Sequence, residues 1–326
     1  MNRAAGITHV IAAPGIGGGG GFGASGAVIA GQASAIHLSG WVIDEMLLRR
    51  SAAMVVTWPT LQTRTLDFST FSFRQRPFRE VKQEFDKKVA ELGDWLERAR
   101  HYAQALEKGS AAKFDRDLTG TSASSFIRGE LPVLVVANRA REIRSALEFC
   151  EKQKLKMILA GGAEAWKVKD LLREKKIPVV LRPTLRLPVE EDDPYDKAFT
   201  QPAELAAAGV KIAFASFGNE FVRRLPQEAG NAAAYGLPHD EAVKAITLYP
   251  AEIFGLADRL GSIEPGKLAN LIVTRGDLLE LNSDIRYLFI NGQLTSTDNK
   301  HRQLYEEYRP PLTRLAPRPT SDSFIL

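Results

Sequence analysis

The feature that most constrains the fold is the alternation of short apolar runs with amphipathic segments between residues 131 and 217. A typical run, LPVLVVA at 131–137, carries no polar side chain, so a strand formed from it must be covered on both faces. Strands of this kind, with helices between them, are typical of parallel sheets in α/β proteins. The alternation therefore predicts a doubly wound sheet or a (β/α)8 barrel. The runs that predict strands lie at 6–13, 27–38, 53–58, 131–137, 155–161, 177–183 and 210–217.

Apolar residues spaced by threes and fours predict the helices that cover such a sheet. The longest of these patterns includes Val81, Phe85, Val89 and Leu92. The predicted helices lie at 79–107, 140–152, 164–175, 203–208 and 240–247.

The pattern changes near the C-terminus. Asn291-Gly292 between two apolar runs is a strong signal for a β-hairpin, which indicates antiparallel structure. Beyond residue 299 the chain is rich in proline and arginine, which favours an extended tail. The predicted organisation is a barrel at 1–257, a small β domain at 258–299 and an extended tail at 300–326.

Composition limits the classes of partner. Lysine and arginine total 43 and aspartate and glutamate 39, so the net charge of +4 is too small for a dedicated nucleic-acid binder. No run of 18 apolar residues occurs, so no membrane partner is expected. The lone Cys150 excludes an internal disulfide and a cysteine zinc site. This chain by itself indicates a cytoplasmic protein, and an export signal upstream of Met1 would change that.

The C-terminal third carries the most specific pattern. Residues 242–277 followed by LFINGQL at 288–294 resemble the C-terminal signature of the amidohydrolase superfamily, and within it the imidazolonepropionase-like branch. A T-x-x-P-A pattern runs from Thr247, and a G-S-I-E-P-G-K loop begins at Gly261. Asn270 stands where that family usually has aspartate. The resemblance implies a TIM-like barrel, here lacking its first strand, and a small β domain.

The same resemblance implies a zinc or iron centre, but its ligand positions are substituted. The family's fifth-strand histidine aligns with Val136, and its sixth-strand histidine falls within residues 160–162. The eighth-strand aspartate, which handles the proton of the attacking water, aligns with Phe217. The His-x-His pair of the first strand occurs nowhere in the sequence. Valine and phenylalanine cannot coordinate a cation, so no metal cofactor is expected.

Three functions remain open at this level. The first is a catalytically degenerate amidohydrolase homologue that binds a small-molecule ligand or serves as a partner subunit. The second is an active hydrolase of non-peptide carbon–nitrogen bonds, such as those in cyclic amides, seen as a fragment without its His-x-His strand. The third is a nucleotide-binding oxidoreductase that uses the glycine-rich loop Gly21–Gly26.

Active sites of such barrels lie at the carboxyl ends of the strands. The side chains expected there are polar but form no metal cage, and they suit an anionic or amide-rich ligand. They are Asn138, Arg139, Glu164, Arg182, Thr184, Ser216 and Asn219. His9, on the first predicted strand, is interpreted as either a ligand contact at this mouth or a hydrogen-bonded histidine of the core or edge.

Loss of a barrel strand would leave the strand at 6–13 with an unpaired edge. Its backbone groups then need partners. The expected occupant is a strand from another chain, in a homo-oligomer or in a complex with a complete amidohydrolase. Local folding of residues 27–38 and docking of the tail are the alternatives.

Overall fold

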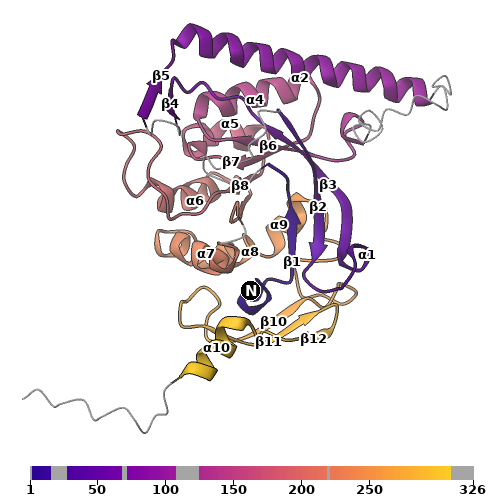
Figure 1. Cartoon of the computed structure of the whole chain (residues 1–326), viewed down its shortest axis with the longest axis vertical. Coiled ribbons are helices and arrows are strands. Elements are labelled where there is room, and N and C mark those ends of the chain that lie inside the picture. The colour runs from indigo at the N-terminus through magenta and orange to yellow at the C-terminus, as the bar shows by residue number, and fades with distance from the viewer. Residues whose placement is uncertain (1, 16–27, 68–71, 108–124, 219–220, 310–326) are drawn as a thin grey trace, which may run out of the picture.

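The computed structural model describes residues 2–15, 28–67, 72–107, 125–218 and 221–309. It contains one curled seven-stranded sheet, a three-stranded sheet and a two-stranded hairpin (Figure 1). The large sheet has the order β1-β2-β3-β6-β7-β8-β9. Its strands are β1 (His9–Ala12), β2 (Ile29–His37), β3 (Leu47–Thr57), β6 (Val133–Ala137), β7 (Met157–Gly161), β8 (Val179–Leu181) and β9 (Ile212–Phe214).

Strands β3, β6, β7, β8 and β9 are parallel, as the apolar runs predict. Strand β2 is antiparallel to both β1 and β3, so the expectation of an entirely parallel sheet is wrong at this end. The reason is the connection between β2 and β3, residues 38–46, which is shorter than the dozen or more residues that a parallel crossover needs. It holds only the short helix α1 (Ile43–Met46).

Within the described residues β1 pairs with β2 alone, so residues 29–37 occupy one side of this strand. β1 is therefore an edge strand, and its other side has no strand partner among the described residues. A strand from another chain on the opposite edge of β1 stays a prediction.

Helices cover the outer face of the sheet. They are α2 (Phe78–Glu107), α4 (Ala140–Lys152), η2 (Ala165–Val168), α5 (Lys169–Glu174), α6 (Lys197–Ala207), α7 (Leu225–Ala234) and α8 (His239–Lys244). Helix α9 (Leu248–Ile253) packs through Ala251 on the concave side. The segment 164–175, expected as one helix, is divided between η2 and α5. The remaining short elements are η1 (Asn2–Ala5), η3 (Val222–Arg224) and the hairpin of β4 (Arg64–Asp67) and β5 (Ser72–Gln75).

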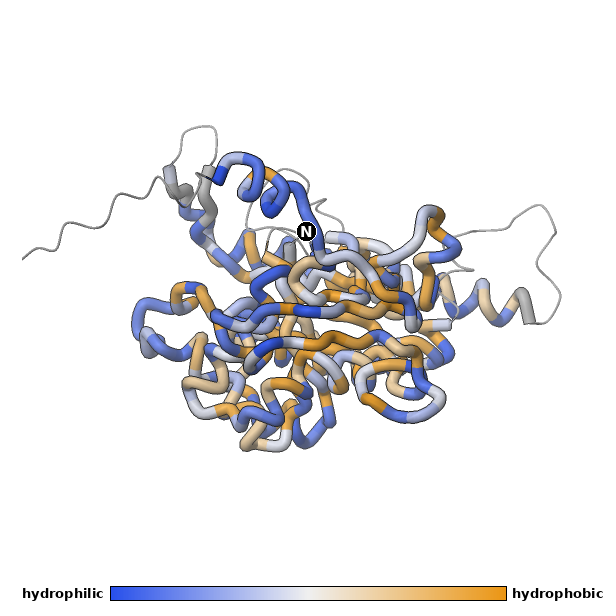
Figure 2. The backbone as a smooth tube through the Cα atoms, turned by 90° about the horizontal axis from the view of Figure 1, so that it is seen from below, coloured by the Kyte–Doolittle hydropathy of each residue, from blue (hydrophilic) through white to orange (hydrophobic). Residues whose placement is uncertain are grey.

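Each face of the sheet packs in its own cluster of buried apolar side chains. In β6, Val133 and Val135 pack outward beneath the helices, whereas Leu134 faces the concave side. The concave cluster is closed by the chain from α9 onward, where Ala251 and Phe254 are buried. Figure 2 shows the resulting hydrophobic strands through the middle of the molecule. Burial on both sides explains why the strands lack the polar alternation of a one-sided sheet.

The small sheet consists of β10 (Leu271–Arg275), β11 (Asp284–Ile290) and β12 (Gln293–Thr295), all antiparallel. Asn291 and Gly292 join the last two strands with φ of 53° and 76°. Two successive positive φ angles are the geometry of a type I′ turn, which the Asn-Gly pair favours. The predicted hairpin is confirmed.

The extended tail predicted at 300–326 is wrong in its first part. Residues Lys300–Tyr308 form the helix α10. The Asn299 side chain accepts hydrogen bonds from the backbone N–H groups of His301 and Arg302, at 3.1 and 3.2 Å, and so starts this helix. Residues 310–326 lie outside the described part of the chain. Among the described helices none has both the length and the apolar character needed to span a bilayer.

His9 lies at the start of β1, opposite His37 of β2. Because β1 and β3 both run antiparallel to β2, His9 lies at the edge away from the carboxyl ends of the parallel strands. The interpretation as a ligand contact at the barrel mouth is therefore wrong. His9 Nδ1 lies 2.8 Å from Thr8 Oγ1, and His37 Nδ1 lies 3.4 Å from Asn270 Nδ2. The pair belongs to the contact between the two sheets.

Burial, with a smaller contribution from His37, lowers the pKa of His9 to about 4, and burial also lowers the pKa of His37. Both rings are then neutral in the folded protein at a pH where the unfolded chain binds protons. We expect the free energy of unfolding to decrease as the pH falls from 6.5 towards 4, by up to about 3 kcal/mol for His9. Urea unfolding at pH 7 and pH 5 measures this loss.

The matched variants are His9→Gln and His301→Gln, the second in the exposed helix α10. His9→Gln should reduce the loss between the two pH values, whereas His301→Gln should leave it as in the wild type. An unchanged loss in His9→Gln would contradict the assignment.

Candidate functional site

The carboxyl ends of the parallel strands meet at one edge of the sheet, and six of the seven expected pocket residues lie there. The seventh, Asn219, lies outside the described residues. The six are Asn138, Arg139, Glu164, Arg182, Thr184 and Ser216. The segments that carry them follow β6, β7, β8 and β9 directly.

Glu164 is buried and ties two of these segments together. Its carboxylate accepts hydrogen bonds from the backbone N–H of Ala140 at 2.7 Å and from Lys167 Nζ at 3.0 Å. Its own N–H donates to the carbonyl oxygen of Asn138 at 2.8 Å. Since Ala140 is the first residue of α4, the carboxylate also compensates the positive end of that helix. These bonds hold the segment after β7 against the segment after β6, so Glu164 has a structural role at this edge.

The acidic loop at 190–193 neutralises two cations of this edge. Arg139 forms an ion pair with Glu190, and Lys167 lies 2.7 Å from Asp193. Burial opposes the ionisation of both groups of the second pair, yet their hydrogen bond raises the pKa of Lys167 and lowers the pKa of Asp193. The pair is therefore charged at neutral pH. Sequence reasoning missed Lys167, because nothing in its helix signals a distant partner.

A second buried carboxylate fixes the segment after β8. Glu228 of α7 accepts hydrogen bonds from both the N–H and the Oγ1 of Thr184, at 2.5 and 2.6 Å. Asn231 Nδ2 donates to the same Oγ1 at 3.3 Å. Thr184 and Glu228 are 1% and 5% exposed. In the sequence, Glu228 is marked only as the single charged residue of the helix LPQEAGNAAA.

Two arginines of the segment after β8 have no ion-pair partner among the described residues. Arg186 donates from Nη2 to the carbonyl oxygen of Ala163 over a long 3.4 Å, and its Nε is buried without a hydrogen-bond partner among the described residues. Burial and the neighbouring Arg182 lower the pKa of Arg186, and the negative charge of Asp193 partly opposes them. The Arg182 guanidinium lies 5.7 Å from the centre of the Phe217 ring. The edge thus holds two neighbouring positive charges. Neither forms an ion pair with a carboxylate of the described residues, although Asp193, which is paired with Lys167, also attracts Arg186.

Further polar atoms at this edge are also unpaired in the described structure. Arg139 Nε and Asn138 Oδ1 are buried without hydrogen-bond partners. Phe217 has a left-handed backbone with φ of 52°, an uncommon conformation for a bulky residue. Unsatisfied polar groups and strained backbone both concentrate at functional sites. A ligand with acceptor oxygens would satisfy the two arginines.

The positions that the resemblance assigns to metal ligands do not fit a metal ion. Val136 and Phe217 pack against the concave apolar cluster, and Gly161 and Gly162 have no side chain. None of these residues offers a donor atom. In the part of the chain that the structure describes, no three His, Cys, Asp or Glu side chains are grouped in a way that could hold a metal ion. The glycine loop at 21–26 lies outside the described residues, so the oxidoreductase hypothesis gains no support.

The chain is similar to known amidohydrolases in sequence and in fold. A family model described as "Amidohydrolase family" matches residues 137–297. A crystal structure of an amidohydrolase from Thermotoga maritima MSB8 is 25% identical, with a TM-score of 0.73 over 90% of this chain and 74% of that one. N-acetylglucosamine-6-phosphate deacetylase from Haemophilus influenzae is 52% identical over 44 residues, which are 13% of this chain. This chain matches 12% of the length of that curated relative.

The bonds between Thr184 and Glu228 predict a measurable cost. Glu228→Met leaves two buried donors of Thr184 without an acceptor, so the free energy of unfolding should decrease by roughly 2–4 kcal/mol. Denaturant unfolding measures the change. The control Glu148→Met makes the same replacement at an exposed position of α4 and should shift stability far less. Equal effects of the two variants would contradict the structural role of Glu228.

Proposed function

Because the chain belongs to the amidohydrolase superfamily, we propose that it uses the superfamily's ligand-binding edge without the metal-dependent chemistry. In this proposal the carboxyl ends of β6 to β9 bind a small anionic molecule through Arg182 and Arg186. The protein acts as a binding or partner subunit. Hydrolysis of a carbon–nitrogen bond is the alternative that the experiments below distinguish.

The observation that carries the proposal is the pair of neighbouring arginines, Arg182 and Arg186, for which the described residues supply only a partial counter-charge from Asp193. Two guanidinium groups close together and partly removed from water raise the free energy of the folded protein. A bound carboxylate or phosphate would offset that cost, and arginine suits such groups because its planar fork can donate two hydrogen bonds at once. The unpaired Nε of Arg186 supplies one such donor.

Two further observations support the class of ligand and the absence of hydrolysis. The deacetylase that matches over 44 residues is named for N-acetylglucosamine 6-phosphate, which is an anion with an amide group. Val136 and Phe217, at the positions of the superfamily's ligands, lie in an apolar environment. Without ligands to hold a metal, the enzyme would lack the means to generate hydroxide from bound water near neutral pH.

The proposed function predicts that the protein binds no metal ion tightly. Purified protein should hold less than one tightly bound zinc, iron or manganese per chain after dialysis, as measured by elemental analysis. Val136→His combined with Phe217→Asp should not produce hydrolysis, because the sequence contains no His-x-His pair. Stoichiometric metal in the wild type, or metal-dependent activity in the double variant, would favour the hydrolase.

The proposed function also predicts that Arg186 contributes to the binding of an anionic ligand. Calorimetric titration with N-acetylglucosamine 6-phosphate as the probe should detect binding, and neutral N-acetylglucosamine should bind more weakly. Arg186→Met should weaken binding of the phosphorylated probe by about 10- to 100-fold, the value of one charge-assisted hydrogen bond. Its stability should be unchanged or higher, since a poorly compensated charge is removed from a partly buried position.

The control is Arg286→Met, on the exposed side of β11, which should bind the probe as the wild type does. Equal weakening in both variants would indicate general attraction by surface charge and contradict the site. Release of acetate from the probe would show an active hydrolase in place of a binding protein.

A further inference from the structure

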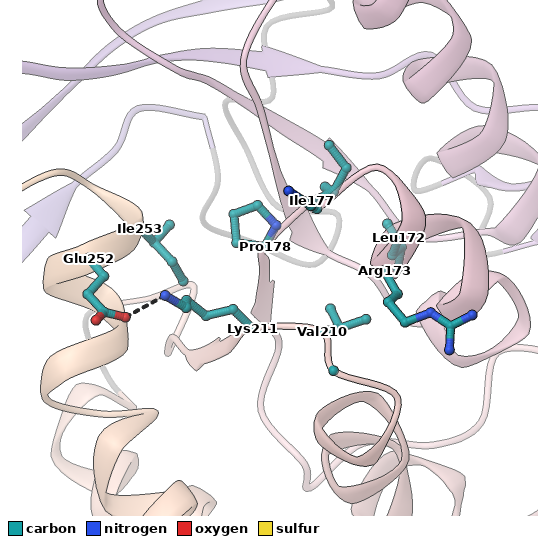
Figure 3. Close-up of a pocket in the computed structure, with 10 residues that line it drawn as sticks. Leu172, Arg173, Ile177, Pro178, Val210, Lys211, Glu252 and Ile253 are labelled. Atoms are coloured by element: carbon teal, nitrogen blue, oxygen red, sulfur yellow. Dashed lines mark hydrogen bonds and ion pairs between the residues drawn. The ribbon is translucent and has the colours of Figure 1, made fainter.

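A separate groove lies at the opposite edge of the sheet, where β8 and β9 begin. It is formed by the end of α5, the connections that lead into the two strands, and α9 (Figure 3). Because parallel strands have their carboxyl ends at the other edge, this groove is distinct from the arginine pair. Neither the family match nor the proposed function assigns it a role.

The groove is a half-open depression whose volume lies in the range of small-molecule sites. Its volume is about 380 Å3, within the range of about 300–1,000 Å3 that is usual for ligand pockets. Pro178, Val210 and Ile253 supply apolar walls. A ligand with an apolar body could therefore remove apolar surface from water there.

The rim of the groove carries more positive than negative charge. Arg173, Lys176 and Lys211 line it together with one carboxylate, Glu252. Figure 3 shows the Lys211 side chain extending to Glu252 of α9, where its Nζ lies 2.6 Å from Oε2. Lys176 is exposed and forms no ion pair with any carboxylate that the structure describes. Arg173 pairs with Asp170 of the same helix at 3.5 Å, so Lys176 is the cation of the lining that has no ion-pair partner among the described residues.

The backbone at Lys176 is unusual for its residue type. Lys176 follows α5 with φ of 53°, and Lys154 follows α4 with φ of 54°. Gly209, at the corresponding point after α6, has φ of 84°. Glycine is the residue that usually takes the left-handed position after a helix. A lysine there puts its charge beside the groove at a conformational cost, although it also compensates the negative end of the helix.

We propose that this groove binds a small molecule that carries a phosphate or carboxylate on an apolar body. The apolar part packs against Pro178, Val210 and Ile253. The anionic group lies at the rim and interacts with Lys176 and with Lys211, whose positive charge Glu252 partly neutralises in the free protein.

The experiment is calorimetric titration with 1-naphthyl phosphate and 1-naphthoate, with 1-naphthol and inorganic phosphate as the separated parts. Both naphthyl anions should bind more tightly than either part. Lys176→Gly should weaken their binding by about fivefold, the upper range for one exposed charge, while stability is kept or raised because glycine suits the left-handed backbone. Glu252→Gln should tighten binding by about two- to fivefold, since it frees Lys211.

The matched control is Lys154→Gly, which removes a lysine from the same backbone conformation outside the groove. It should bind both probes as the wild type does. Equal weakening by Lys154→Gly, or no effect of Lys176→Gly, would overturn the proposal, and so would a wild type that binds neither probe.

The arginine edge also attracts anions, so Arg186→Met is titrated with the same probes. Binding that persists in Arg186→Met and weakens in Lys176→Gly supports the groove, whatever the outcome for the proposed function. Binding that is lost in Arg186→Met and kept in Lys176→Gly assigns the probes to the arginine edge and overturns the groove.

Discussion

The packing of apolar side chains on both faces of the curled sheet is the constraint on which the rest of the structure depends. Each parallel strand sends alternate residues to the outer helices and to the concave face. The concave side is filled by Ala251 and Phe254 and by the residues that follow them, together with small and branched residues of the strands. A sheet filled in this way has an apolar interior up to the edge where its parallel strands end.

That packing determines what chemistry the edge can support. Val136 and Phe217 continue the concave cluster to the carboxyl ends of the strands, where a metal-dependent enzyme would need donor atoms. Polar groups are left to the connecting segments, and there most of them hold the segments in place. Glu164 accepts a hydrogen bond from the backbone N–H of Ala140, and Glu228 accepts two from Thr184. The loop at 190–193 neutralises Arg139 and Lys167. Arg182 and Arg186 form no ion pair with a described carboxylate, which is why they are the binding groups of the proposed function.

The two edges of the sheet thus present different surroundings to anions. At the carboxyl ends, arginines lie close together and partly out of water, which suits strong and directional hydrogen bonds. At the amino ends, lysines stand on an exposed rim around apolar walls, which suits weaker attraction combined with apolar contact. The histidine pair on β1 and β2 lies on the amino-end side as well, but it belongs to the contact with the small sheet.

The sequence by itself determined the parallel core, because a continuous apolar run such as 131–137 is stable only as a strand covered on both faces. It also determined the Asn291-Gly292 hairpin, whose turn requires two positive φ angles. Only the tertiary structure decided the antiparallel direction of β2, which depends on a short connection, and the helix after Asn299, which depends on its cap. It also decided which charges are paired. Lys167 and Asp193 are 26 positions apart in sequence, and Arg139 and Glu190 are 51 apart, so no local pattern encodes these pairs.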